Sequence, residues 1–363
     1  MSRPTIAGVA RAAGVSVASV SRVLNGLPAT GEMVERVQRA VEELGYVPDS
    51  RARSLKVGRT FQLTLAVADV GNPVYVTMMR AVEEVVSAAG YRLVVTTTGP
   101  DVVDEVALVR GMARGYADGL VISPLRVDDD LIKSIRECDV PVVVAGNVPS
   151  SAGVDTVRAN SPKGMLLAVE HLLAKGRKRI AFVNGPVDTV PGTARAKGFA
   201  DAMKANGLRP VAEVEAVDFT FAAGREAGAE LLAGVGGFDR SGVKGADRGG
   251  VKGGNRENGD RNGGKAASRQ LDAVIAANDL LAVGIMHELA ARDLVVPADV
   301  AVIGMDDSEL AEQCFPPLTS VNLGSAERGR RAAELLLARI DDDTRTPRRI
   351  VVQPTLSVRR STP

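Results

Sequence analysis

The sequence predicts a small all-α N-terminal domain followed by a larger α/β domain that is built on parallel sheets. Two observations lead to this fold class. Residues 1–46 carry apolar side chains at helical spacing without a strand-like run, whereas from residue 61 onward short apolar runs alternate with helical patterns. Buried strands that alternate with helices form parallel sheets with helices on both faces. The length of 363 residues provides for two or three domains.

The first helices are marked by capping residues and glycine turns. Thr5 is placed to cap the first helix, which Gly14 ends, and Ser16 caps a second helix. A third helix is expected to begin near Thr30 and to end at Gly45, before Pro48. The apolar residues that we expect these helices to bury are Ile6, Val9, Ala10, Ala13, Val15, Val20, Val23, Leu24, Val34, Val37, Val41 and Leu44.

Two helices joined by a glycine turn are typical of a helix-turn-helix, whose second helix enters the major groove of DNA. The Arg22 side chain has the forked geometry that reads guanine, and Val17 and Ala18 can meet thymine methyl groups. Short polar side chains nearby suit phosphate contacts. The candidate DNA-contacting residues here are Thr5, Ser16, Val17, Ala18, Ser19, Ser21, Arg22 and Asn25. The simpler alternative is a three-helix core without a partner.

The charge pattern indicates that any binding of nucleic acid would be local to the N-terminal region. The whole chain has a net charge of +1, so a global attraction to nucleic acid is excluded. The first 60 residues nevertheless hold nine Arg or Lys against five Asp or Glu, and much of that charge falls within 51–59. A solvated basic face is the simpler interpretation of these residues.

The cellular setting follows from the cysteines and from apolar runs. Cys138 and Cys314 are far apart, which fits a reducing cytosol better than a disulfide framework or a zinc site. No apolar run is long enough to span a bilayer, and the first ten residues lack a signal-peptide core. We therefore expect a cytoplasmic protein without a metal or another cofactor.

The larger domain has strand-like runs that end in polar or glycine-containing tips. In parallel α/β folds, ligands bind just beyond the carboxyl ends of the strands. These tips are therefore the candidates for a pocket. They are Asn72-Pro73, Ser123-Pro124, Gly146-Asn147, Asn184-Gly185-Pro186, Asn278-Asp279 and Asp306-Asp307.

Residues 234–269 interrupt the α/β pattern. They are dense in Gly and charge, and "DRSGVKGA" is followed at once by the near-repeat "DRGGVKGG". Such a segment buries too little apolar surface to offset the entropy of ordering it. We expect a disordered insertion that can be deleted without loss of function.

The stretch "TIAGVARAAGVSVASVSRVLNG" resembles the headpiece of the lactose-repressor (LacI/GalR) family of bacterial transcription regulators. The resemblance continues through "ELGYVPDSRARSLKVGRT", "VEHLLAKGRKRIAFVNGP", "ARAKGF", "AANDLLAVG", "DVAVIGMDD" and "PPLTSVN", and covers essentially the whole chain. Ala7-Gly8 departs from the charged pair that is usual on the first helix. The 234–269 insertion is also atypical.

The resemblance implies a repressor that binds a pseudo-palindromic operator in double-stranded DNA as a homodimer. It implies a headpiece at 1–46, a hinge helix and linker at 47–60, and an effector-binding and dimerisation domain at 61–356. In the hinge, Leu55 would wedge into the minor groove and Arg51, Arg53 and Lys56 would supply charge. A charged interdomain linker is the alternative for this segment. We expect association with the nucleoid.

The resemblance further implies a periplasmic-binding-protein-like (type I) pair of subdomains, joined by three crossovers. One subdomain would hold about 61–159 and 291–319, and the other about 160–290 and 321–356. The implied effector-binding residues are Tyr75, Asn147, Arg195, Phe219, Asn278 and Asp306. Core packing is the alternative for Tyr75 and Phe219, and a strand-end cap is the alternative for Asp306. Asn147 stands where many members of the family have an acidic residue.

These residue types suit a small neutral polar effector, a mono- or oligosaccharide or its derivative, because donors and acceptors at fixed angles recognise a polyol. A nucleobase or nucleoside is the alternative effector, since Phe219 could stack on a purine. An enzyme is not expected, because the motifs of a nucleophile elbow and of a P-loop are missing. A sugar-binding receptor would share the larger domain but would not need residues 1–60.

Overall fold

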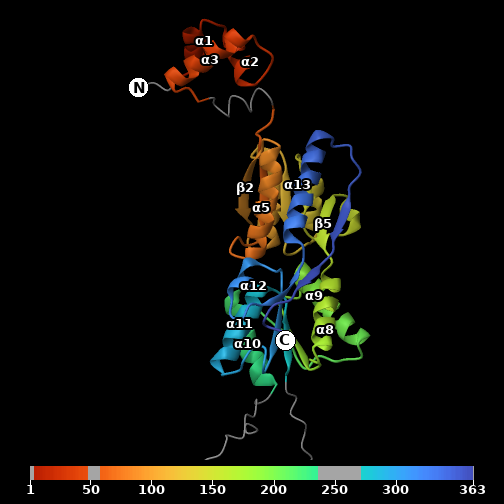
Figure 1. The fold of residues 1–363 in the computed structure, drawn as a ribbon. Coiled ribbons are helices and arrows are strands. Elements are labelled where there is room, and N and C mark those ends of the chain that lie inside the picture. The colour runs from red at the N-terminus through yellow and green to blue at the C-terminus, as the bar shows by residue number, and fades with distance from the viewer. Residues whose placement is uncertain (1–3, 48–57, 236–270, 363) are drawn as a thin grey trace, which may run out of the picture. The chain divides into compact units, whose positions relative to one another are not determined.

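The computed structural model describes residues 4–47, 58–235 and 271–362 (Figure 1). The chain divides into two units, Met1–Phe61 and Gln62–Pro363, which are described separately here. The expected hinge contacts at Arg51, Arg53, Leu55 and Lys56 lie outside the described residues.

The N-terminal unit consists of α1 (Ile6–Ala13), α2 (Val17–Leu24) and α3 (Gly31–Leu44). The Thr5 side chain accepts a hydrogen bond from the Gly8 N–H, and the Ser16 side chain accepts one from the Ser19 N–H, so both serine and threonine caps form. Gly14 ends α1 with a φ of 65°, in the left-handed region that favours glycine. The chain bends by 102° between α1 and α2, which lies in the range of helix-turn-helix motifs.

The three helices close a small apolar core. Val9, Val20 and Val37 are fully buried at its centre. The expected burial of Leu44 is wrong, because Leu44 is 40% exposed at the end of α3, and Tyr46 packs against the core instead. Among the described residues, no single helix is long and apolar enough to cross a membrane; α1 and α2 meet the length and composition criteria only as a bent pair.

The second unit contains two six-stranded sheets, each flanked by helices on both faces. The first sheet is entirely parallel and has the strand order β11-β5-β4-β3-β1-β2. In its register, Leu65 lies opposite both Val95 and Val121. Its strands are β1 (Gln62–Val67), β2 (Arg92–Thr97), β3 (Leu120–Ser123), β4 (Val142–Val144), β5 (Asp155–Ala159) and β11 (Arg349–Val352).

The second sheet has the order β12-β10-β9-β8-β6-β7, and only β12 runs antiparallel to its neighbour. Its central strands are fully buried, which explains why they read as continuous apolar runs. Its strands are β6 (Ile180–Asn184), β7 (Glu213–Glu215), β8 (Ala273–Ala276), β9 (Ala301–Met305), β10 (Thr319–Asn322) and β12 (Thr355–Ser357).

The helices divide between the two lobes that the sheets define. In the first lobe α13 packs along α5, and the two lie side by side in Figure 1. The first-lobe helices are α5 (Pro73–Ala88), α6 (Val102–Gly111), η1 (Met112–Arg114), α7 (Asp129–Arg136), η2 (Ser150–Ala152) and α13 (Ser325–Asp341). The second-lobe helices are α8 (Ser161–Ala174), α9 (Val190–Ala205), α10 (Phe221–Gly234), α11 (Asp279–Ala291) and α12 (Glu309–Gln313).

The expected division of residues 291–356 between the lobes is wrong. The resemblance places residues 291–319 in the first lobe, but β9 and β10 complete the second sheet, since β9 pairs between β8 and β10. It places residues 321–356 in the second lobe, but α13 packs on α5 and β11 pairs with β5 in the first. The three crossovers are present, at Asn160, at 323–324 and at 353–354.

The expected insertion at 234–269 begins too early by two residues. Gly234 is the last residue of α10, and Val235 is 9% exposed within the second-lobe core. The rest of the segment, up to residue 269, lies outside the described residues. The described chain resumes at Leu271, at the amino end of β8, whereas the carboxyl end of β8 leads to Asn278.

Candidate functional site

The exposed face of α2 carries the side chains that the sequence assigns to DNA contact. Val17 is 45% exposed, and Ala18 and Arg22 are exposed beside it, because Val20 turns into the core. The Asn25 amide donates to the Ser21 carbonyl at 2.6 Å, and the Ser16 and Ser19 hydroxyls lie 2.9 Å apart. These short polar side chains therefore shape the ends of α2.

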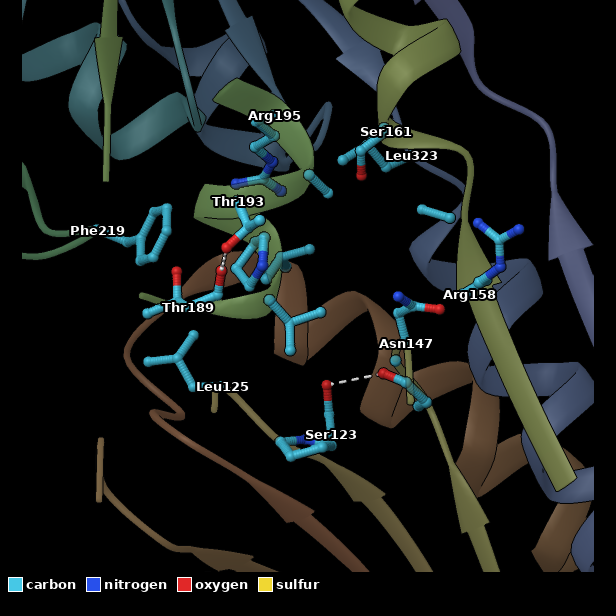
Figure 2. A pocket seen from close by; sticks show the side chains of 18 of the residues that line it. Ser123, Leu125, Asn147, Arg158, Ser161, Thr189, Thr193, Arg195, Phe219 and Leu323 are labelled. Carbon is cyan, nitrogen blue, oxygen red and sulfur yellow. Dashed lines mark hydrogen bonds between the residues drawn. The ribbon is translucent and has the colours of Figure 1, made fainter. Parts of the chain in front are cut away.

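In the second unit, a cavity of about 550 Å³ lies between the carboxyl ends of the two sheets. Its walls come from both lobes, and Figure 2 shows Phe219 and Arg195 on one side and Arg158 and Asn147 on the other. All six residues that the sequence assigns to the effector line this one cavity: Tyr75, Asn147, Arg195, Phe219, Asn278 and Asp306.

Arg195 and Asp306 form a buried ion pair at the cavity wall. The Arg195 Nη2 lies 3.2 Å from the Asp306 Oδ1, and the residues are 7% and 8% exposed. Asp306 follows β9 with a φ of 102°, a conformation that turns its carboxylate toward α9. Burial raises the pKa of Asp306, while the nearby Arg195 and Arg328 act to lower it. The pair thus offers a donor and an acceptor side by side.

Phe219 supplies an apolar face next to this pair, and Asn278 holds it in place. The Arg195 guanidinium carbon lies 5.8 Å from the centre of the Phe219 ring. The Asn278 amide donates to the Phe219 carbonyl at 2.9 Å, and its oxygen caps α11 by accepting from the Leu281 N–H. Asn278 therefore positions Phe219 as well as lining the cavity.

The first lobe contributes hydroxyl groups to the cavity. Tyr75, in the first turn of α5, hydrogen-bonds to Ser123, and burial raises the pKa of its phenol, so this group is neutral. The Ser123 hydroxyl also donates to the Ala145 carbonyl at 3.0 Å (Figure 2). Asn147, in the loop after β4, is exposed.

The sequence interpretation missed two arginines that line the cavity, Arg158 on β5 and Arg328 on α13. The Nε of Arg328 is buried and has no hydrogen-bond partner among the described residues, and the same holds for the Nε of Arg195. Burial lowers the pKa of Arg328. Nothing in the helical pattern around Arg328 distinguishes it from its exposed neighbour Arg331.

Two contacts join the lobes at the mouth of the cavity. Arg126, after β3, donates to both carboxylate oxygens of Asp188, at 2.8 and 3.0 Å, and the Val190 N–H donates to the Leu125 carbonyl at 2.8 Å. Glu105 of α6 holds the loop that follows β3, because its Oε1 accepts a hydrogen bond from the Leu125 N–H at 3.2 Å. Burial raises the pKa of Glu105 to about 7.

Glu105 should make the stability of the folded protein depend on pH. Because its pKa is higher when folded than the ordinary 4.5, stability falls as the pH rises from about 4.5 to about 7. We expect Glu105→Gln to reduce this fall, by at most about 1.4 kcal/mol per pH unit. Denaturant unfolding at several pH values measures this pH dependence of the free energy of unfolding. The exposed Glu226→Gln is the control, and an equal pH dependence in both variants would contradict the prediction.

Among the residues that the structure describes, no group of three or more His, Cys, Asp or Glu side chains is arranged to hold a metal ion. The cavity is instead lined by side chains that donate and accept hydrogen bonds, together with the aromatic rings of Tyr75 and Phe219. Such a lining suits binding of a small polar molecule.

Comparison with known proteins identifies this architecture. Residues 5–49 match the bacterial regulatory proteins of the lacI family, residues 60–234 the periplasmic binding proteins and sugar binding domain of the LacI family, and residues 169–362 a periplasmic binding protein-like domain. Over 99% of its length the chain is 35% identical to the HTH-type transcriptional regulator CelR of Thermobifida fusca, of which 98% is covered. The chain belongs to the lacI family of bacterial regulatory proteins.

Other relatives of this lacI-family protein match over nearly its full length. The ribose operon repressor of Escherichia coli K12 is 32% identical over 98% of the chain and 99% of the relative. The HTH-type transcriptional repressor PurR of Vibrio parahaemolyticus is 31% identical over 98% of both. The family resemblance seen in the sequence is thereby confirmed, and the protein is a regulator and not an enzyme.

Solved structures confirm the predicted fold class of this lacI-family protein. The transcriptional regulator CelR in complex with cellobiose is 32% identical, with a TM-score of 0.67 over 99% of this chain and 100% of that one. The lac repressor dimer bound to operator and the anti-inducer ONPF is 24% identical, with a TM-score of 0.82 over 99% of both chains. At that identity the second likeness concerns the fold alone.

Proposed function

We propose that this lacI-family protein is a transcriptional repressor that binds operator DNA as a homodimer and that a small carbohydrate in the cavity controls its DNA affinity. The observation that carries the proposal is the Arg195–Asp306 pair beside the Phe219 ring, in a chain that also presents the exposed α2 face. The cavity can bind a small molecule, and the exposed helix can contact DNA bases.

The chemistry of the cavity favours a carbohydrate. A sugar ring presents an apolar face that stacks on an aromatic ring, and hydroxyl groups that both donate and accept hydrogen bonds. Phe219 provides the first kind of contact, and Arg195, Asp306 and Ser123 provide the second. The relatives named for a ribose operon and the structure with cellobiose support this ligand class.

A nucleobase is the second candidate effector, because a purine could also stack on Phe219. The relatives named PurR support it. We place it second because the cavity of about 550 Å³ brings together hydroxyl and guanidinium groups from both lobes, an arrangement suited to a ligand with many hydroxyls.

We propose the α2 residues Val17, Ala18 and Arg22 as the base-reading group, with the neighbouring Ser and Asn side chains on phosphates. Arg51, Arg53, Leu55 and Lys56 stay the proposed hinge contacts. Both cysteines are free thiols, which supports a cytoplasmic protein. Binding to operator DNA would place that protein at the nucleoid.

Operator binding tests the proposal directly. DNA selected from a random pool by the full-length protein should contain a pseudo-palindrome, since each subunit presents one recognition helix. Affinity for that DNA should fall at least about tenfold between 50 and 200 mM salt, because Lys and Arg contacts to phosphate release counterions. Binding that shows neither a sequence preference nor a salt dependence would refute the proposal.

The effector class needs a second measurement. A thermal-shift screen with sugars, nucleobases and nucleosides should show stabilisation by a carbohydrate, since a ligand at 100 times its dissociation constant adds about 2.7 kcal/mol to the free energy of unfolding. Stabilisation by a purine and by no carbohydrate would make the nucleobase the effector.

A further inference from the structure

The cavity holds more positive than negative charge. The charged side chains that line it are Arg158, Asp188, Arg195, Lys197, Asp306 and Arg328. Both acids are already engaged in ion pairs, Asp188 with Arg126 and Asp306 with Arg195. Lys197 pairs with Asp201, outside the cavity lining, at 2.6 Å. Arg158 and Arg328 have no carboxylate within ion-pair distance in the part of the chain that the structure describes.

Of these two arginines, Arg328 says more about the ligand, because it approaches the Arg195–Asp306 pair from the opposite lobe. Arg328 belongs to α13 of the first lobe, whereas Arg195 and Asp306 belong to the second. Its Nη2 donates a hydrogen bond to the Ser325 hydroxyl, at 3.1 Å. The Asp306 carboxylate favours its charge, and the Arg195 guanidinium opposes it. The buried Asp306 carboxylate thus interacts electrostatically with two guanidinium groups, those of Arg195 and Arg328.

Two buried N–H groups add to the free-energy cost of this concentration of positive charge. The Nε atoms of Arg195 and Arg328 both lack an acceptor among the described residues. A buried donor without an acceptor and a buried charge without a counter-charge each cost free energy. An anion in the cavity would supply a counter-charge to Arg328, which lines it, since carboxylates and phosphates match the fork of a guanidinium.

We propose that the effector is an anionic carbohydrate, either a sugar phosphate or a sugar acid, whose anionic group is bound by Arg328. The inference rests on the proposed function and narrows its ligand class. Hydroxyl groups of the same ligand would donate to Asp306, and Arg158 supplies a second cation from the first lobe. A neutral ligand, which the sequence alone suggested, would add no counter-charge to the one carboxylate, Asp306, that Arg195 and Arg328 share.

The test compares charged and neutral sugars on the full-length protein at one ionic strength. The probes are the monophosphates of glucose and ribose, gluconate and galacturonate, with glucose, ribose, galactose and cellobiose as neutral probes. The variants are Arg328→Met, which keeps the bulk of the side chain, and Arg328→Lys, which keeps its charge. Arg331→Met is the matched control, because Arg331 lies one turn further along α13, is exposed, and pairs with Glu327 and Glu334.

We expect at least one anionic sugar to bind the wild-type protein more tightly than its neutral parent, as measured by calorimetry. Arg328→Met should weaken that ligand by roughly 10- to 100-fold, the range for hydrogen bonds to charged groups. Arg328→Lys should weaken it less, and Arg331→Met should leave it unchanged. Arg331→Met should also leave the affinity for the neutral parent unchanged, and in the two Arg328 variants that affinity should fall by a smaller factor than the affinity for the anionic sugar.

The outcomes distinguish a failure of this inference from a failure of the proposed function. If neutral sugars bind and the anionic ones do not, the inference is overturned while the carbohydrate effector stands. If an anionic sugar binds equally well to Arg328→Met, the inference is also overturned, because the anion then lies elsewhere. If no carbohydrate of either kind binds, both the inference and the carbohydrate effector fail, and the operator experiment still decides the DNA-binding role.

Discussion

Replacing Arg22 by alanine should abolish much of the preference for operator over unrelated DNA. Arg22 is exposed on α2 beside Val17 and Ala18, where its fork can reach the O6 and N7 atoms of a guanine. The loss should be about 1–3 kcal/mol for each half-site, and a homodimer reads two half-sites. Competition binding with the selected operator and a scrambled duplex measures this loss, and calorimetry should show effector binding unchanged.

Arg39→Ala serves as the control for Arg22, since Arg39 is exposed on α3 and is outside the recognition helix. It should change the affinity for both duplexes by the same small factor or not at all. If Arg22→Ala weakened both duplexes equally, Arg22 would contact a phosphate, and the base-reading role would be wrong.

Gly284→Ala should destabilise the second lobe. A Cβ atom on Gly284 would lie 2.5 Å from the Phe221 carbonyl oxygen and 2.7 Å from the Arg225 nitrogen, so α10 and α11 would have to move apart. Overpacking of this kind costs about 1–3 kcal/mol. Because Phe219 precedes α10 and Asn278 caps α11, the effector affinity should fall as well. Denaturant unfolding and calorimetry measure the two effects.

Gly234→Ala is the matched control in the last position of α10, where a Cβ atom would meet nothing within 4 Å. It should leave the free energy of unfolding unchanged or raise it by at most about 1 kcal/mol, because alanine is the better helix former. Equal stability of the two variants would show that α10 and α11 can separate without cost.

The sequence predicted the parts of this protein whose periodicity and caps are local. The helices α1 and α2, the buried strands and the polar strand ends follow from spacing within a few residues. The distribution of 291–356 between the lobes did not follow, because the short link at 323–324 between β10 and α13 looks the same whichever sheet comes next. Leu44 fits the apolar pattern of α3, yet the helix extends past the core there.

The candidate site was predictable where a strand end or a family motif marked it, as at Asp306, Asn278 and Arg195. Arg328 could not be found in this way. An arginine within an amphipathic helix normally faces solvent, and only the packing of α13 on α5 decides which of its arginines turns toward the cavity. Its place in the cavity wall is a property of tertiary packing rather than of the local sequence.

The interleaving of the two lobes sets the order in which a growing chain can complete them. β5 is made early, but its outer neighbour β11 comes from residues 349–352, after all strands of the second sheet except β12. Until then the β5 edge has no partner on that side, and α5 lacks the cover of α13. Open strand edges invite association with other chains. On the ribosome, the lobe that is begun first is therefore finished nearly last, and it is the one most in need of protection during synthesis.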